Sequence, residues 1–293
     1  MPVSIAYFFC LYFLLMSNLQ TNNRFKEEKL KMQSKYGKMI IVLMGLLSFS
    51  FLPEKQIKIY LIGDSTMADK SVKAYPETGW GMPFHYFFNK NAIVDNTAQN
   101  GRSTRTFIEE GRWKAVYDAL KPGDYVLIQF GHNDEVPTKR SYTPPAQYKA
   151  NLLKFIAESR SKGAFPILIT PVARRAFDSN GKLLDTHHAY AHIVRETAKE
   201  AKLPLIDLDQ LSRDLLQKLG PEKSAFLYNH LDPAENPHYS KGHTDNTHFS
   251  ELGARTMAEI VLQQIEEQDL GLENYIKNIS QNNVKQSNEK MHE

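Results

Sequence analysis

The stretch IKIYLIGDSTMADK, residues 57–70, decides the fold, because its apolar run stops abruptly at GDST, residues 63–66. An apolar run of this length that ends at glycine predicts a buried strand, which leaves its sheet through a tight turn. Ser65 then lies just beyond the strand, where a following helix begins. Parallel α/β sheets place their chemistry at that edge. The alternative is a serine that only caps the next helix.

Strand-like and helix-like segments alternate along the rest of the chain. Four further apolar runs predict strands at residues 92–97, 125–131, 165–171 and 203–208. Apolar residues at helical spacing predict helices at residues 105–120, 146–160, 187–201 and 250–267. This alternation predicts a parallel sheet covered by helices on both faces. Since such crossovers are nearly always right-handed, we expect a doubly wound, three-layer α/β/α fold with a five-stranded, mainly parallel sheet.

Composition excludes several classes of function. The 293 residues carry a formal net charge of +3, without a long basic block, which argues against nucleic acid as the main partner but allows an anionic substrate. The only cysteine is Cys10, which lies in an apolar run near the N-terminus. The globular part therefore has no thiol for catalysis and no cysteine ligands for zinc.

The pattern of the first fifty residues predicts a targeting region. Apolar runs at 4–16 and 39–52 are both shorter than the roughly 18–20 residues that span a bilayer. The second run follows two lysines and offers Ser48-Phe49-Ser50, a small-x-small pattern suited to signal peptidase. We therefore expect a signal peptide at 32–50 and an exported protein, periplasmic or secreted, with no stable membrane partner beyond that peptide. A double-anchored N-terminus is the alternative.

The remaining boundaries follow from that interpretation. Residues 1–31 are then an over-long start or an extra hydrophobic leader. The globular domain covers residues 55–270. Residues 271–293 are polar, and we expect a disordered tail there. Nothing in the sequence indicates an oligomeric state.

Polar residues stand at several strand ends and before the last helix, in an order that suits acyl transfer. Ser65 can be a nucleophile, and His248 can be its base. Asp245, three residues before His248, can hold the other imidazole nitrogen and fix its tautomer. The backbone N–H groups of Ser65 and Gly101, with the side-chain amide of Asn133, can stabilise an oxyanion.

Each of these residues also has an ordinary structural interpretation. Gly101 can be a plain turn glycine, and Asn133 can cap a helix or close an Asx-turn. Asp245 and His248 can be ordinary polar residues of a loop. Asp64 is next to the serine and more plausibly braces the turn than serves as the acid. The case for a catalytic site rests on all four segments reaching one predicted sheet edge.

The motifs also resemble a known family. GDST (63–66), NGRS (100–103), GHND (131–134) and DNTH (245–248) are similar to the four sequence blocks of the SGNH, or GDSL, hydrolase superfamily. The resemblance covers most of residues 57–268. It implies a flavodoxin-like α/β/α fold and ester hydrolysis through an acyl-enzyme, without metal or other cofactor. It also assigns Ser65 as the nucleophile, His248 as the base and Asp245 as the acid. Gly101 and Asn133 are assigned as oxyanion donors.

A narrower resemblance suggests the substrate. GWGMPF, NGRSTRTF, VLIQFGHNDE, TPVARRAFDSNGKLLDTH and GHTDNTHFSELGA look like the rhamnogalacturonan acetylesterases, carbohydrate esterases of pectin breakdown. This resemblance implies removal of acetyl groups from acetylated pectic polysaccharide or oligosaccharide. The alternatives are another acyl ester, such as acetylated xylan or a lipid, and a non-catalytic carbohydrate-binding protein on the same fold. The polar segment 229–246 disfavours a lipid.

Four arginines are candidates for binding a uronate carboxylate: Arg102, Arg105, Arg174 and Arg175. Surface salt bridges are the alternative for each of them.

Two other groups of side chains have simpler interpretations. Trp80 could stack on a sugar, although packing is the better interpretation. The histidines at 187, 188 and 192 lack the HExxH pattern, so we assign them to substrate loops or a helix surface rather than to a metal site.

Overall fold

Five parallel strands form the central sheet of the computed structural model, which describes residues 30–32, 36 and 56–277. The strand order is β2 (Ala92–Asn96), β1 (Ile57–Gly63), β3 (Tyr125–Gln129), β4 (Phe165–Ile169) and β5 (Leu205–Ile206). All four strand pairings are parallel, so the carboxyl ends of the strands share one edge. The predicted α/β class and the five-stranded parallel sheet are confirmed.

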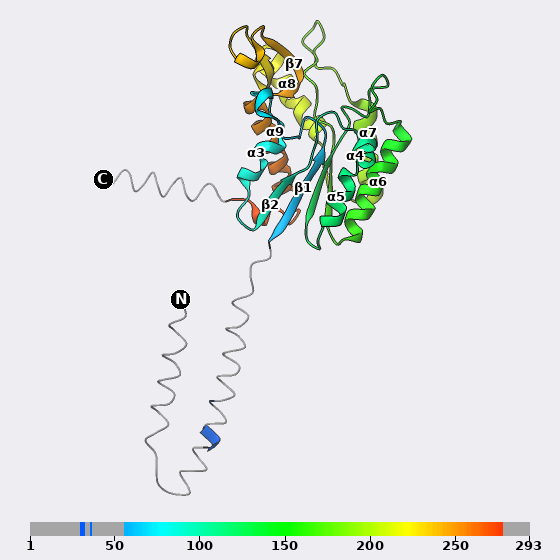
Figure 1. The fold of residues 1–293 in the computed structure, drawn as a ribbon, viewed down its shortest axis with the longest axis vertical. Coiled ribbons are helices and arrows are strands. Elements are labelled where there is room, and N and C mark those ends of the chain that lie inside the picture. The colour runs from blue at the N-terminus through cyan, green and yellow to red at the C-terminus, as the bar shows by residue number, and fades with distance from the viewer. Residues whose placement is uncertain (1–29, 33–35, 37–55, 278–293) are drawn as a thin grey trace, which may run out of the picture. The chain divides into compact units, whose positions relative to one another are not determined.

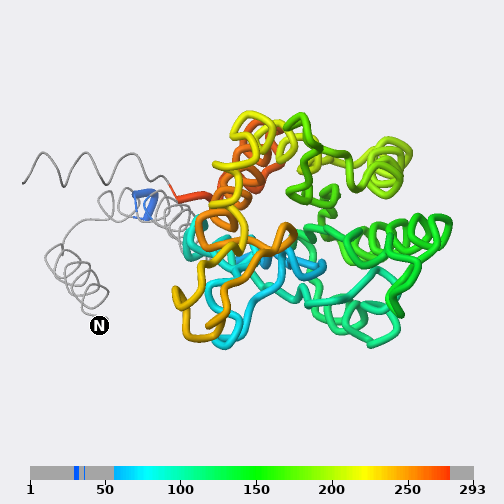
Figure 2. Tube along the Cα trace, turned by 90° about the horizontal axis from the view of Figure 1, so that it is seen from above, coloured from blue at the N-terminus to red at the C-terminus, as the bar shows by residue number. Residues whose placement is uncertain are grey.

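Alternate side chains of β1 enter two separate cores, which makes the fold three-layered. Ile59 and Leu61 pack in one core, and Tyr60 and Ile62 pack in the other. Figures 1 and 2 show the helices on the two sides of the sheet. The first core is covered by α3 (Gly81–Phe84), α8 (Leu208–Ser224) and α9 (Glu251–Glu267). The second is covered by α4 (Thr104–Glu109), α5 (Arg112–Ala119), α6 (Pro145–Ser161) and α7 (His188–Ala201).

Short elements complete the domain. An antiparallel pair, β6 (Tyr228–Leu231) and β7 (His243–Phe249), forms a second sheet. Single 3₁₀ turns occur at Val72–Ala74, His85–Phe87, Ala225–Leu227, Pro237–Tyr239 and Glu273–Tyr275.

The segment after β1 differs from the sequence prediction, because no helix begins at Ser65. The chain makes one turn, in which the N–H of Ala68 donates to the carbonyl of Asp64 at 3.0 Å. The carbonyls of Thr66 and Met67 then accept from the N–H groups of Trp80 and Gly81, at 2.9 and 3.1 Å. These carbonyls are therefore paired with the returning chain, and no helix follows the turn.

Three other elements differ from expectation. The predicted helix at 105–120 is two helices, α4 and α5, separated at Gly111, because glycine is a poor helix former. Helix α8 was not predicted, although its leucines carry helical spacing at residues 208, 211, 215, 216 and 219. The β6–β7 pair replaces the polar loop expected at 229–246. Its strands are mostly half-exposed, so they lack the apolar pattern that marks a strand.

The expected leader segments 1–31 and 32–50 lie outside the described residues, except for residues 30–32 and 36, which are helical. Most of the expected tail, from residue 278 on, also lies outside them. Residues 271–277 continue the folded domain, since Ile276 bridges Phe88 and the N–H of Lys277 donates to Phe87. Within the described ranges, no helix combines the length and the apolar character needed to cross a bilayer.

A stability prediction follows from the contact between α9 and the 3₁₀ turn Ala225–Leu227. A Cβ on Gly253 would lie 1.7 Å from the carbonyl oxygen of Leu227. We expect Gly253→Ala to lower the free energy of unfolding by about 1–3 kcal/mol, because overpacking outweighs the gain in helix propensity. Urea unfolding followed by circular dichroism measures this. Leu252→Ala, at a side chain that is 58 % exposed, is the control and should change stability by less than about 0.5 kcal/mol. Equal stability of the two variants would contradict the prediction.

Candidate active site

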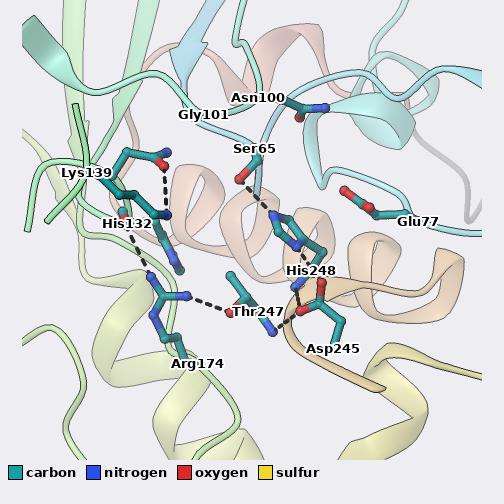
Figure 3. A pocket seen from close by; sticks show the side chains of 11 residues that line it. Ser65, Glu77, Asn100, Gly101, His132, Lys139, Arg174, Asp245, Thr247 and His248 are labelled. Atoms are coloured by element: carbon teal, nitrogen blue, oxygen red, sulfur yellow. Dashed lines mark hydrogen bonds and ion pairs between the residues drawn. The ribbon is translucent and has the colours of Figure 1, made fainter. Parts of the chain in front are cut away.

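A cavity of about 420 Å³ opens at the carboxyl end of β1, next to Ser65. In the sheet, β2 lies next to β1 on one edge of β1, and β3 lies next to β1 on its other edge. The strand order therefore reverses at β1. Open α/β sheets form their ligand crevices at such switch points. The cavity is lined by polar and charged residues from every segment named by the motifs: Ser65, Glu77, Asn100, Gly101, His132, Asn133, Lys139, Arg174, Asp245, Thr247 and His248 (Figure 3).

Asp64 braces the turn that carries Ser65. Its Oδ1 accepts from the N–H of Thr66 at 3.0 Å and from the Thr66 hydroxyl at 2.8 Å. Burial raises the pKa of Asp64, and the Thr66 donors oppose that rise. The Thr66 hydroxyl also accepts from Gln129, which in turn accepts from the fully buried indole N–H of Trp80. The packing role predicted for Trp80 is therefore confirmed.

Ser65, His248 and Asp245 form a continuous hydrogen-bonded chain. The Ser65 Oγ lies 2.9 Å from His248 Nε2, and His248 Nδ1 lies 2.7 Å from Asp245 Oδ2. A carboxylate only accepts, so Nδ1 carries the hydrogen and Nε2 is the nitrogen that accepts from Ser65. The structure therefore brings together the three residues that the sequence proposed as nucleophile, base and acid.

The local backbone of β7 holds Asp245 ionised. Its Oδ1 accepts from the N–H groups of Thr247 and His248, at 2.7 and 3.0 Å. Burial alone would raise the pKa of Asp245, but the side-chain and backbone donors of His248, with Thr247, hold that pKa well below its ordinary value. The charged form of the carboxylate is thus strongly favoured next to the imidazole.

The proposed oxyanion donors lie around the same cavity. The N–H groups of Ser65 and Gly101 donate to no acceptor within residues 56–277. Gly101 has a φ of +76°, which explains the glycine, because other residues rarely adopt that conformation. The side chain of Asn133 is oriented by Arg102, whose carbonyl accepts from Nδ2 at 3.2 Å. Free N–H groups next to a serine hydroxyl are what an oxyanion site requires.

Asp134 ties two of these segments together. Its Oδ1 accepts from the N–H and the hydroxyl of Thr104, at 2.9 and 2.6 Å. Burial raises the pKa of Asp134 to about 7, against the opposing Thr104 donors. Because Thr104 begins α4 just after Gly101, this contact fixes the Gly101 loop against the segment that carries Asn133.

Of the four candidate arginines, only Arg174 lines the cavity. Its guanidinium donates to the hydroxyl of Thr247 at 2.6 Å and to the carbonyl of His132 at 3.3 Å. It also lies 3.4 Å from Glu135, which contacts the buried His187 at 2.8 Å. Burial, followed by the neighbouring His187 and Arg174, lowers the pKa of His132 well below its ordinary value, which favours the neutral imidazole.

The other three arginines contact protein groups instead. Arg102 pairs with Glu110 at 3.0 Å, and Arg105 pairs with Glu109 at 2.8 Å. Arg175 donates to Ser224 at 3.1 Å and to Asn246 at 2.8 Å. These contacts fit the salt-bridge and packing alternative better than substrate binding.

The histidines of the segment 187–192 do not act together. His187 is buried against Glu135, whereas the His188 side chain is 82 % exposed and His192 is exposed. In the part of the chain that the structure describes, no three His, Cys, Asp or Glu side chains form a possible metal-binding group.

Sequence reasoning missed several cavity residues: Glu77, Asn100, His132, Lys139 and Thr247. His132 and Thr247 lie inside the motifs GHND and DNTH, so motif position alone could have found them. Lys139 lies on a loop, 3.5 Å from Asn133, and nothing in its local sequence marks it.

Comparison with known proteins identifies the family of this chain. The sequence model of the GDSL-like Lipase/Acylhydrolase family matches residues 61–256. Rhamnogalacturonan acetylesterase RhgT of Bacillus subtilis is 41 % identical over 223 residues, which are 76 % of this chain and 95 % of the relative.

Solved structures share the fold. The crystal structure of YxiM from Bacillus subtilis has a TM-score of 0.64 and 30 % identity, over 74 % of this chain and 58 % of that one. The acetylxylan esterase Axe2 of Geobacillus stearothermophilus has a TM-score of 0.54 and 21 % identity, over 73 % of this chain and 96 % of its own. The chain therefore belongs to the GDSL-like lipase/acylhydrolase family and is a carboxylic ester hydrolase.

Proposed function

We propose that this protein removes acetyl groups from acetylated pectic polysaccharide, with Ser65 as nucleophile, His248 as base and Asp245 as the orienting acid. The observation that carries the proposal is the Ser65–His248–Asp245 chain, with contacts of 2.9 and 2.7 Å, at the wall of a polar cavity. A non-catalytic binding protein would not need this arrangement.

The first half of the reaction forms an acetyl-enzyme. Ser65 Oγ attacks the acetyl carbon while His248 Nε2 takes the hydroxyl proton. The negative charge that develops on the carbonyl oxygen is stabilised by the N–H groups of Ser65 and Gly101 and the amide of Asn133. The intermediate then collapses, the bond to the sugar oxygen breaks, and His248 donates its proton to that oxygen.

The second half uses water as the nucleophile. His248 takes a proton from water, whose oxygen attacks the acetyl carbon of the acetyl-enzyme. When the second tetrahedral intermediate collapses, the bond to Ser65 breaks, Oγ regains the proton and acetate leaves. Asp245 remains ionised through both halves and stabilises the imidazolium form of His248.

Charge at the cavity supports a uronate substrate. Arg174 and Lys139 line it as cations, with Glu135 3.4 Å from Arg174, while Glu77 is paired with Lys70 and Asp245 accepts from His248. An arginine fork suits a carboxylate next to the acetylated position. The identity with RhgT supports the same substrate class.

Acetylated xylan is the second candidate, but the likeness to Axe2 supports the fold alone. We further propose that the protein acts after export, as expected from residues 32–50, because a polysaccharide is too large to cross a bilayer.

Ser65→Ala tests the nucleophile. We expect acetate release from acetylated rhamnogalacturonan to fall by at least about 10³-fold, because no other hydroxyl replaces the attacking atom. Acetate release is measured for both proteins on acetylated rhamnogalacturonan and acetylated xylan. Ser161→Ala, at an exposed residue near the end of α6, is the matched control. Undiminished release by Ser65→Ala would refute the mechanism, and preference of the native protein for xylan would refute the substrate.

Asp245→Asn tests the orienting acid through pH. In the native protein, activity should fall on acidification because His248 takes a proton, while Asp245, with its lowered pKa, stays charged. Without the carboxylate the imidazolium forms less readily, so the acid limb of kcat should move to lower pH. Maximal kcat should fall by about 10⁴-fold, because an amide favours the wrong tautomer. Asp118→Asn, in an exposed pair on α5, is the control. An unchanged pH profile in Asp245→Asn would contradict this role.

Arg174→Gln tests carboxylate binding. We expect kcat/KM on acetylated rhamnogalacturonan to fall by about 10–100-fold, the equivalent of one hydrogen bond between charged groups. Hydrolysis of p-nitrophenyl acetate, which has no carboxylate, should change much less. Arg105→Gln, in which the lost partner is Glu109, is the control. Equal losses on both substrates would show that Arg174 supports the site rather than the substrate.

A further inference from the structure

Lys70 is buried beside the nucleophile, which is unusual for a lysine. Its side chain is 1 % exposed. Its ammonium group lies 2.6 Å from the carbonyl oxygen of Ser65, 2.8 Å from Asn100 Oδ1 and 2.7 Å from Glu77 Oε1. An ammonium group has three donors, and all three have acceptors here.

The three acceptors belong to three different parts of the site. The Ser65 carbonyl lies in the turn that carries the proposed nucleophile. Asn100 immediately precedes Gly101, and their shared peptide carries the N–H proposed for the oxyanion. Glu77 immediately precedes Thr78, whose N–H donates to the carbonyl of Phe249 at 3.0 Å. Phe249 follows His248 in β7, so Lys70 links all three segments.

The positive charge of Lys70 is paired with the carboxylate of Glu77. Lys70 therefore differs from Arg174 and Lys139, the cations that line the cavity. Glu77 forms a close ion pair with it, and Lys70 itself is not among the residues that line the cavity. Buried ion pairs add little net stability, because desolvation offsets much of the attraction. The hydrogen bonds from Lys70 to the Ser65 carbonyl and to Asn100 instead fix the position of Ser65 relative to the Gly101 loop.

We propose that Lys70 is a positioning residue, which holds the N–H groups of Ser65 and Gly101 in register around one oxyanion. This inference rests on the proposed function, since it assumes that Ser65 is the nucleophile. Oxyanion donors act only at a defined position, and a displacement of about 1 Å can reduce a rate by about 10²-fold. Loss of Lys70 should therefore affect the chemical step more than substrate binding.

Lys70→Met is the test variant, because methionine keeps most of the side-chain length without the ammonium group. On p-nitrophenyl acetate we expect kcat per active site to fall by about 10–100-fold, with KM within about threefold of the native value. Phenylboronic acid, which forms a tetrahedral adduct with a nucleophilic serine, should bind more weakly by a similar factor. A purely structural role would lower the yield of active protein but would leave both quantities unchanged in the folded fraction.

Lys58→Met is the matched control, since it removes an ion pair with Asp95 on the neighbouring strands, at partly exposed side chains. It should leave kcat and boronate affinity unchanged. Asn100→Ala provides a second variant if Lys70→Met does not fold, because it removes one acceptor while keeping the ion pair. We expect a smaller fall, about tenfold, in kcat and in boronate affinity.

The outcomes separate this inference from the proposed function. If Ser65→Ala retains activity, the proposed mechanism fails, whatever Lys70 does. If Ser65→Ala is inactive but folded Lys70→Met keeps native kcat and boronate affinity, only the positioning role is overturned. Native values in Asn100→Ala, where Lys70→Met is unfolded, would overturn it equally.

Discussion

The return of the chain onto the turn after β1 is the constraint on which the site depends. Trp80 and Gly81 donate to the carbonyls of Thr66 and Met67, at 2.9 and 3.1 Å, and so hold the turn that carries Ser65. The N–H of Ser65, in the turn that this return holds, has no acceptor within residues 56–277. The same return brings residues 77 and 78 beside β7, where Thr78 pairs with Phe249. The return of the chain therefore links the turn that carries Ser65 to the strand that carries His248.

Sequence reasoning located the catalytic candidates because their positions are set by topology. Parallel strands end at one edge, so the segments that follow β1, β2 and β3 meet there, and these carry Ser65, Gly101 and Asn133. His248 lies on β7, outside that sheet, and was located by its motif. The topology did not distinguish the arginines that line the cavity from those that contact other protein groups. Arg174 and Arg175 are adjacent, yet only Arg174 lines the cavity, because the neighbouring side chain donates to Ser224 and Asn246. Such differences depend on the packing of each side chain against β7 and α8, which the local sequence does not specify.

The carboxyl groups around Ser65 are all hydrogen-bonded or paired, so they repel negative charge at the oxyanion site less than free carboxylates would. Burial raises the pKa values of Asp64 and Asp134, the latter to about 7, and each carboxyl accepts from a neighbouring threonine hydroxyl. Asp245 remains charged, but its charge is directed at His248. Glu77 faces Lys70 at 2.7 Å. Negative charge that develops at the acetyl oxygen thus meets donors and compensated pairs rather than free carboxylates.

Substrate recognition and the triad share a physical link through Thr247. Its hydroxyl accepts from Arg174 at 2.6 Å, while its N–H donates to Asp245 at 2.7 Å. A uronate carboxylate that pairs with Arg174 would compete with Glu135 and the Thr247 hydroxyl for the same guanidinium. On the proposed function, a carboxylate bound to Arg174 would therefore act on a residue, Thr247, that also holds the carboxylate of Asp245.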